Sequence, residues 1–106
     1  MSHNTLALFL TDSSQIQYID IIKKSYDYDD VVIITDNNFT TPDYSIIPIF
    51  YIKFFKGHIV FLSLTDYLNN REYFPVNQVS LAITDDELSK SNIDINKLHL
   101  HKVIKL

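Results

Sequence analysis

The clearest pattern in the chain lies near its start, where the apolar run Thr5-Leu6-Ala7-Leu8-Phe9-Leu10 is followed by a helical pattern and then by Val31-Val32-Ile33-Ile34. Both runs are apolar along almost their whole length, which is typical of strands covered on both faces in a parallel sheet. Between them, isoleucines recur at helical spacing and predict a helix over about residues 14–26. Strand, helix and strand form a βαβ unit, so we expect the two strands to lie side by side and parallel.

The middle of the chain leaves two arrangements open. Two apolar runs, residues 46–55 and 58–64, flank Gly57, the only glycine of the chain. Because glycine accepts positive φ, Lys56-Gly57 is compatible with a tight hairpin turn that would make the two runs antiparallel neighbours. Alternatively, the chain turns there without pairing. Pro48 cannot donate a ladder hydrogen bond, so we expect its segment at an edge or at the start of a strand.

The last third of the chain repeats the alternation of helix and strand. A short helix is predicted over residues 65–70 and a strand over residues 79–83. Thr84 and Glu87 match a capping box, in which the Thr84 hydroxyl accepts from the first turn and Glu87 reaches back, and this box begins a helix over about residues 85–91. Residues 98–106 alternate in polarity and predict a final strand at an edge.

The sequence therefore predicts a single α/β domain over residues 1–106, with a Rossmann-like, mainly parallel sheet of five or six strands and flanking helices. The alternative is an α+β fold built on an antiparallel hairpin around Gly57. The length of 106 residues is that of one domain.

Composition excludes several classes of function. The chain has no cysteine, so it has no thiolate metal site and no thiol nucleophile. Its single glycine excludes a G-x-G-x-x-G fingerprint and a P-loop. The net charge of −4 weighs against broad binding to nucleic acid. The N-terminus lacks the features of a signal peptide, and no apolar run has membrane-spanning length. We therefore expect a cytoplasmic protein that binds neither nucleic acid nor membranes.

Four apolar runs end in the dipeptide Thr-Asp, which supplies the candidate ligand-binding residues Asp12, Asp36, Asp66 and Asp85. In an open parallel sheet the carboxyl ends of the strands share one edge, where such folds bind ligands. Grouped carboxylates suit Mg²⁺ or the hydroxyl groups of a ligand. Helix capping is the more frequent use of Thr and Asp at such positions. A phosphoacceptor site would use similar positions, but Asp12 has no acidic neighbour and no lysine directly follows Ile83.

A second candidate feature is a group of aromatic residues in the middle of the chain. Aromatic side chains most often serve packing in a core, but they also form surfaces that are buried by a partner protein or by another copy of the chain. The candidate interface residues are Phe50, Tyr51, Phe54 and Phe55.

A third candidate feature is the pair His99 and His101, which an extended strand places on one face. Two imidazoles occur together in some metal sites, but the sequence offers no third ligand. We therefore expect an exposed edge strand here.

The order of the elements also resembles a known group. The segments Leu6-Ala7-Leu8-Phe9-Leu10, Val31-Val32-Ile33-Ile34-Thr35-Asp36 and Ile49-Phe50-Tyr51-Ile52-Lys53-Phe54-Phe55-Lys56-Gly57-His58-Ile59-Val60-Phe61 resemble small phage proteins, notably from marine cyanophages. Those proteins are similar to the N-terminal Rossmann-like half of two-domain glycosyltransferases. In that half, an aromatic-x-Gly step leads to an apolar strand and a short helix, as Phe55-Lys56-Gly57 to Tyr67-Leu68 does here. The resemblance covers roughly residues 5–85.

The resemblance implies a viral module that is non-catalytic or depends on a partner. Such transferases bind the sugar nucleotide mainly through their C-terminal domain, so no donor-site residue carries over and a nucleotide-sugar is a weak candidate ligand. Two hypotheses of function follow. The first is a non-catalytic or partner-dependent binding module, with a protein partner or a homodimer. The second is a small Mg-dependent enzyme or phosphoacceptor domain that uses the four aspartates.

Overall fold

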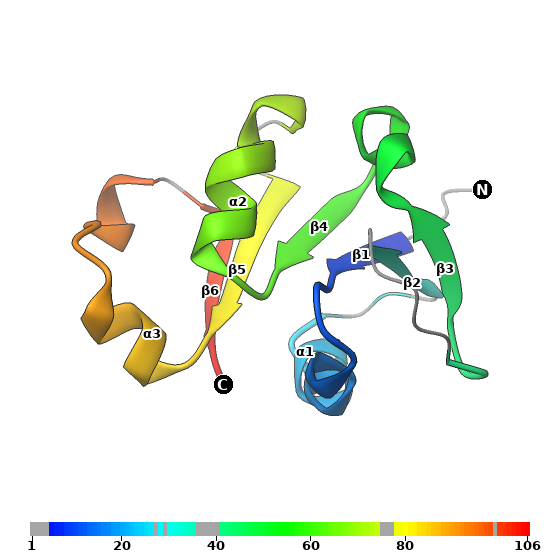
Figure 1. The fold of residues 1–106 in the computed structure, drawn as a ribbon, viewed down its shortest axis with the longest axis horizontal. Coiled ribbons are helices and arrows are strands. Elements are labelled where there is room, and N and C mark those ends of the chain that lie inside the picture. Colours follow the sequence, from blue (N-terminus) through cyan, green and yellow to red (C-terminus); the bar gives the residue numbers. More distant parts are fainter. Residues whose placement is uncertain (1–4, 27, 29, 36–40, 75–77, 99) are drawn as a thin grey trace.

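A computed structural model describes residues 5–26, 28, 30–35, 41–74, 78–98 and 100–106, and it shows one six-stranded sheet (Figure 1). The strand order is β3-β2-β1-β4-β5-β6, and every neighbouring pair is parallel. This is the order found in dinucleotide-binding Rossmann folds. The predicted α/β class with a Rossmann-like sheet is confirmed. The strands are β1 (Thr5–Phe9), β2 (Asp30–Thr35), β3 (Ser45–Pro48), β4 (His58–Phe61), β5 (Val79–Ile83) and β6 (Lys102–Lys105).

Helices cover both faces of the sheet (Figure 1). The helix α1 and the 3₁₀ turn before it pack on one face, and η2, α2 and α3 pack on the other. None of the helices in the described ranges is long and apolar enough to cross a bilayer. The helices are η1 (Ser13–Tyr18), α1 (Ile19–Lys24), η2 (Ile49–Phe54), α2 (Leu64–Asn70), η3 (Arg71–Tyr73), α3 (Asp85–Lys90) and η5 (Ile95–Lys97), where η denotes a 3₁₀ helix.

The strand β1 lies in the middle of the sheet, between β2 and β4. Its side chains alternate between the faces, with Leu6 and Leu8 in the core under α1 and Ala7 and Phe9 in the core under α2. All four are buried, as the unbroken apolar run predicts for a central parallel strand. The rings of Phe9 and Phe61 lie 5.3 Å apart and join β1 to β4.

The predicted middle strand over residues 46–55 is wrong in its second half. The strand β3 ends at Pro48, at an edge of the sheet, and residues 49–54 form the 3₁₀ helix η2. The physical reason is a spacing of three. Ile49, Ile52 and Phe55 recur at the period of a 3₁₀ helix and pack on the core, which a strand of period two could not achieve with the same residues.

The hairpin around Gly57 is also wrong, and with it the α+β alternative. The strand β4 after Gly57 pairs in parallel with β1, and the chain turns without pairing at Gly57. Gly57 does not have a left-handed φ. A Cβ there would lie 3.0 Å from the main-chain oxygen of Thr5 and 2.9 Å from Cζ of Phe55. The glycine therefore permits a close approach of two chain segments rather than a tight turn.

The remaining predicted elements are confirmed with shifted bounds. The predicted helix over 14–26 is a 3₁₀ turn followed by α1, and α2 begins at Leu64. The last strand is the edge strand β6, and it is shorter than the predicted residues 98–106, since it begins only at Lys102 and ends at Lys105. Thr84 Oγ1 accepts from the N–H of Glu87 at 3.2 Å, as predicted. The Glu87 carboxylate instead accepts from the N–H of Leu64 at 2.8 Å.

Candidate functional site

The parallel sheet places the carboxyl ends of β1, β4 and β5 next to one another. Asp12, Asp66 and Asp85 follow these three strands along the chain. The strand order reverses between β1 and β4, and parallel sheets of this kind bind ligands outside such a reversal. Asp36, which follows β2, lies outside the described residues. The sequence thus predicted the correct edge for three of the four aspartates.

The carboxylate of Asp12 caps η1. Its Oδ1 accepts a hydrogen bond from the N–H of Ser14 at 3.0 Å. In return, Oε1 of Gln15 accepts from the N–H groups of Thr11 and Asp12, at 2.8 and 3.1 Å. This is a complete capping box, so the capping interpretation is confirmed for Asp12.

Asp66 and Asp85 lie in the first turns of α2 and α3. The residue that caps α2 is Ser63, whose Oγ accepts from the N–H of Asp66 at 3.5 Å. Asp85 is exposed, and its Oδ1 lies 3.8 Å from Nζ of Lys105. Negative charge is stabilising near a helix N-terminus, so these positions suit carboxylates without any ligand.

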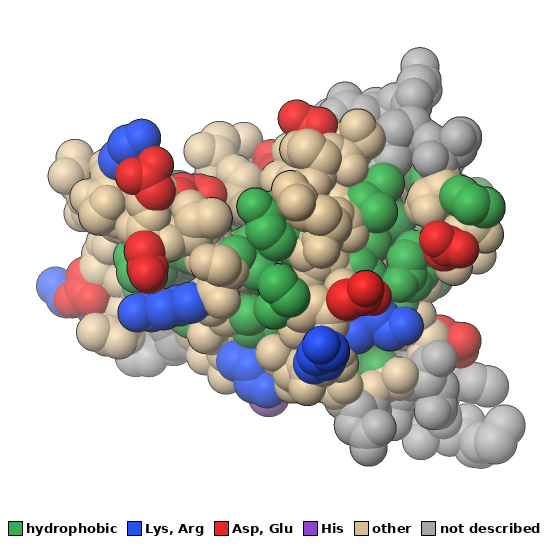
Figure 2. All heavy atoms as spheres, turned by 90° about the horizontal axis from the view of Figure 1, so that it is seen from below, with side chains coloured by type: hydrophobic (Ala, Val, Ile, Leu, Met, Phe, Trp, Pro, Cys, Tyr) green, Lys and Arg blue, Asp and Glu red, His purple; other side chains and the backbone are tan. Residues whose placement is uncertain are grey.

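These aspartates do not gather into a metal site with one another. Among residues whose positions the structure gives, no three His, Asp or Glu side chains are grouped so that they could hold a metal ion. Figure 2 shows acidic and basic side chains interspersed on the face seen from below Figure 1, with no continuous acidic surface. A Mg²⁺ site that includes Asp36 stays a prediction.

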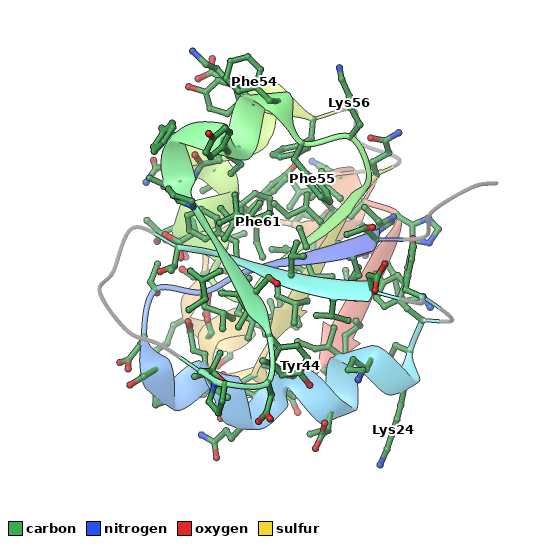
Figure 3. The ribbon with its side chains drawn as sticks, turned by 90° about the vertical axis from the view of Figure 1, so that its right-hand side faces the viewer. Lys24, Tyr44, Phe54, Phe55, Lys56 and Phe61 are labelled. Atoms are coloured by element: carbon green, nitrogen blue, oxygen red, sulfur yellow. The ribbon has the colours of Figure 1, made fainter. Side chains whose placement is uncertain are left out.

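Three of the four candidate interface residues lie exposed on η2. The exposed fractions are 64% for Phe50, 49% for Tyr51 and 63% for Phe54. The ring centre of Tyr51 lies 4.5 Å from that of Phe50 and 6.5 Å from that of Phe54. We call these three residues the aromatic surface. Phe55 is half-buried and packs on the core that contains Phe61 (Figure 3). The core interpretation is therefore wrong for the three residues of the aromatic surface.

A shallow apolar pocket lies beside the aromatic surface. It is lined by Ile47 of β3 and by Tyr51, Phe54 and Phe55, and its volume is about 340 Å³. Pockets that hold small ligands measure about 300–1,000 Å³, so this one lies at the lower end of that range. Tyr73, which is 43% exposed, borders a second pocket on the other side of η2.

Sequence reasoning missed a polar cluster at the opposite, amino-terminal edge of the sheet. His58 begins β4, and its Nε2 lies 2.9 Å from Oγ of Ser80 on β5. The Tyr26 hydroxyl, which follows α1, donates to the same Oγ and lies 3.4 Å from Nε2 of His58. Ser80 is fully buried and His58 is 7% exposed. Polar residues inside apolar strands were the signal that could have revealed this cluster.

The cluster is electrostatically neutral. Burial lowers the pKa of His58 to about 4, and Coulombic interactions with His101 and Lys102 act in the same direction. Burial also raises the pKa of Tyr26, against the opposing effect of its hydrogen bond with Ser80. Because Ser80 is shielded from solvent, its hydroxyl is unavailable as a nucleophile. The cluster joins the end of α1 to β4 and β5, and we assign it a structural role.

The predicted histidine pair is only half described. His99 lies outside the described residues, and His101 is exposed before the edge strand β6. The ring of His101 lies 4.5 Å from that of His58, at an angle of 69°. The exposed edge strand is thus as expected.

Comparisons with family models, with curated proteins and with solved structures find no match for this chain.

Proposed function

We propose that the protein is a non-catalytic or partner-dependent binding module that docks its aromatic surface on a protein partner. One observation carries the proposal. Three aromatic side chains of η2 are about half or more exposed, those of Phe50, Tyr51 and Phe54. Aromatic residues are enriched where protein partners meet, and large exposed ones clustered together mark interaction sites.

The size of the surface supports a docking role. A buried aromatic side chain covers about 150–250 Å², so the exposed parts of these three correspond to about 300–400 Å². The largest apolar patch on a monomer is about 300–600 Å² and is often functional. A specific interface buries about 800 Å² per partner, so the aromatic surface would supply up to about half of one. A second copy of the chain is one partner that fits this proposal.

The resemblance to phage proteins extends the proposal. It supports a viral origin for the module, derived from the N-terminal half of a glycosyltransferase, and hence a location in the host cytoplasm. The Rossmann-like strand order agrees with such a half-domain. The proposal includes no binding to nucleic acid or to membranes, in keeping with the net charge of −4.

The experiment has two parts, each with the same variants. Sedimentation equilibrium measures self-association over a range of protein concentrations. In parallel, peptides that bind the immobilised protein are selected from a displayed library of random sequences. Both readouts are repeated with the double variant Phe50→Ser, Phe54→Ser and with Ile21→Ser. Ile21 is an apolar residue of α1 that is 44% exposed, so it provides a matched control.

The proposal predicts that the double variant loses dimerisation or peptide binding by about tenfold or more, as interface anchors do, while Ile21→Ser loses neither. The proposal is contradicted if the protein stays monomeric and if no selected peptide needs Phe50 and Phe54 for binding. Far-UV circular dichroism of the double variant confirms that the fold is retained.

A second candidate function rests on the reversal of strand order between β1 and β4. A small Mg-dependent enzyme, a phosphoacceptor or a nucleotide-sugar binder would place its ligand there, next to Asp12 and Asp66. Amide NMR spectra with Mg²⁺ and then with mixed nucleotide-sugars test this. Shifts confined to the carboxyl edge that disappear in Asp66→Asn support it, and unchanged spectra reject it.

A further inference from the structure

Two lysines adjoin the aromatic surface, one on η2 and one just after it. Residues 44–65 contain two lysines, Lys53 and Lys56, and no aspartate or glutamate, in a chain whose net charge is −4. Both lysines are exposed, and no ion pair joins either to another described residue. Nζ of Lys53 lies 5.4 Å from the ring centre of Phe54. Figure 3 shows Phe54 and Lys56 projecting from the same end of the molecule.

The two lysines distinguish between a second copy of the chain and an anionic protein as the partner of this surface. Two copies packed face to face through η2 would bring four lysines together, and like charges across an interface oppose association. An anionic partner would instead complement Lys53 and Lys56, and opposite potentials also accelerate the encounter. The electrostatics therefore favour a different chain with acidic side chains.

The neighbouring strand indicates the conformation of that partner. The strand β3 forms one edge of the sheet, and within the described part of the chain only β2 pairs with it. An edge strand offers main-chain N–H and C=O groups to an extended segment. Pro48 has no N–H to donate, so such pairing uses those of residues 45–47 whose main-chain groups point away from β2.

The pocket lies where a paired segment would place a side chain. Ile47 of β3 forms one wall of it, and Tyr51, Phe54 and Phe55 form the others. Successive side chains of a strand alternate between the faces, so a segment paired with β3 sets every second side chain on the face of this pocket. A volume of about 340 Å³ is sufficient for one large apolar side chain.

This inference rests on the proposed function and names the chemistry of its partner. We propose that the partner is an extended, acidic segment of another protein, which pairs with the outer edge of β3, inserts an apolar side chain into the pocket and sets a carboxylate against Lys53 or Lys56.

The test uses peptides of about twelve residues selected from the displayed library against the full chain. Their sequences are determined, and the affinity of the enriched peptides is measured by fluorescence anisotropy. The variants are the double charge reversal Lys53→Glu, Lys56→Glu and the control Lys24→Glu. Lys24 is an exposed lysine at the opposite end of the molecule in Figure 3, so the control reverses one charge away from the aromatic surface.

The inference predicts that the enriched peptides carry acidic residues beside a large apolar one. The double charge reversal should weaken their binding by about tenfold or more, and Lys24→Glu should weaken it by less than about twofold. Amide exchange should slow on peptide binding at those of residues 45–47 whose N–H points away from β2, because main-chain pairing protects amides. Slower exchange at these amides, together with the dependence on Lys53 and Lys56, supports the proposal.

Other outcomes overturn the inference in distinguishable ways. One outcome is that the peptides need Phe50 and Phe54 for binding but lack acidic residues, or bind equally well after the charge reversal. This outcome contradicts the inference and leaves the proposed function in place. A selection in which no peptide depends on the aromatic surface, with a monomeric protein, rejects both. Sedimentation with phosphatidylserine-containing vesicles that requires Lys53 and Lys56, with no acidic peptide enriched, assigns the surface to lipid headgroups and overturns the inference.

Discussion

The carboxylate of Glu87 on α3 accepts a hydrogen bond from the main-chain N–H of Leu64, the first residue of α2, at 2.8 Å. The first N–H groups of a helix have no partner within the helix. Ser63 satisfies one of them at the start of α2, and Glu87 satisfies another from a residue 23 positions further along the chain. The contact ties α2 to α3 at the carboxyl edge of the sheet.

Replacing Glu87 should therefore weaken the whole fold. Glu87→Ala is expected to lower the free energy of unfolding by about 1–2 kcal/mol, because it leaves a half-buried N–H without an acceptor. Glu87→Gln keeps an acceptor oxygen and should cost less. The measurement is urea unfolding followed by circular dichroism. Glu72→Ala, at an exposed residue of η3, is the control and should stay within about 0.5 kcal/mol of the wild type.

The low pKa of His58 makes stability depend on pH. The pKa is about 4 in the folded chain against an ordinary value of 6.5, so the folded state favours neutral His58. Its contribution is complete above pH 6.5 and is lost as the pH falls from 6.5 towards 4. Below about pH 4 both states are protonated, and the loss ends at no more than about 3 kcal/mol.

Urea unfolding of the wild type and of His58→Gln at a series of pH values isolates this effect, because carboxylates titrate in both proteins. The difference in free energy between them should shrink as the pH falls through that window. A difference that is constant with pH would contradict the neutral state of His58.

The hydroxyl of Ser80 is the shared partner of the buried cluster. Ser80→Ala should lower the free energy of unfolding by about 1–3 kcal/mol, because the half-buried Tyr26 and the buried His58 each lose a hydrogen bond. Ser89→Ala removes an exposed serine of α3 and should change it by less than about 0.5 kcal/mol. A double-mutant cycle with Tyr26→Phe should show non-additive losses, and additive losses would mean that the two side chains act independently.

Replacing Gly57 by a residue with even the smallest side chain should destabilise the fold. The Cβ of Gly57→Ala would lie 3.0 Å from the main-chain oxygen of Thr5, which the sheet holds in place. We expect a loss of about 1–3 kcal/mol, the usual cost of overpacking. The neighbouring exposed change Lys56→Ala is the control. An equal stability of both variants would show that the approach of residue 57 to β1 is looser than this.

The alternation of strand and helix could be predicted from sequence wherever a segment buried both of its faces. The runs at residues 5–10, 31–34 and 79–83 are apolar at every or nearly every position, and all three are interior strands. The run at 46–55 is also mostly apolar, yet six of its ten residues form a 3₁₀ helix. Composition could not distinguish the two states, whereas the spacing of Ile49, Ile52 and Phe55 could have.

In the candidate site, likewise, contacts between residues close in sequence could be predicted and contacts between distant residues could not. The capping chemistry of Asp12 and Thr84 is local, because a side chain and an N–H two or three residues away determine it, and it was predicted correctly. The cluster of Tyr26, His58 and Ser80 joins residues 22 to 54 positions apart, and no local pattern encodes their meeting. The exposure of the aromatic surface likewise follows from the position of η2 outside the sheet edge.

The central place of β1 has a consequence for biosynthesis. A ribosome makes β1 first, and β2 and then β3 add outward on one side of it. The strands β4, β5 and β6 add outward on the other side, each against a strand that has already emerged. Because every new strand meets a neighbour that is already made, the sheet can assemble in the order of translation, without waiting for a later segment to complete an earlier pair.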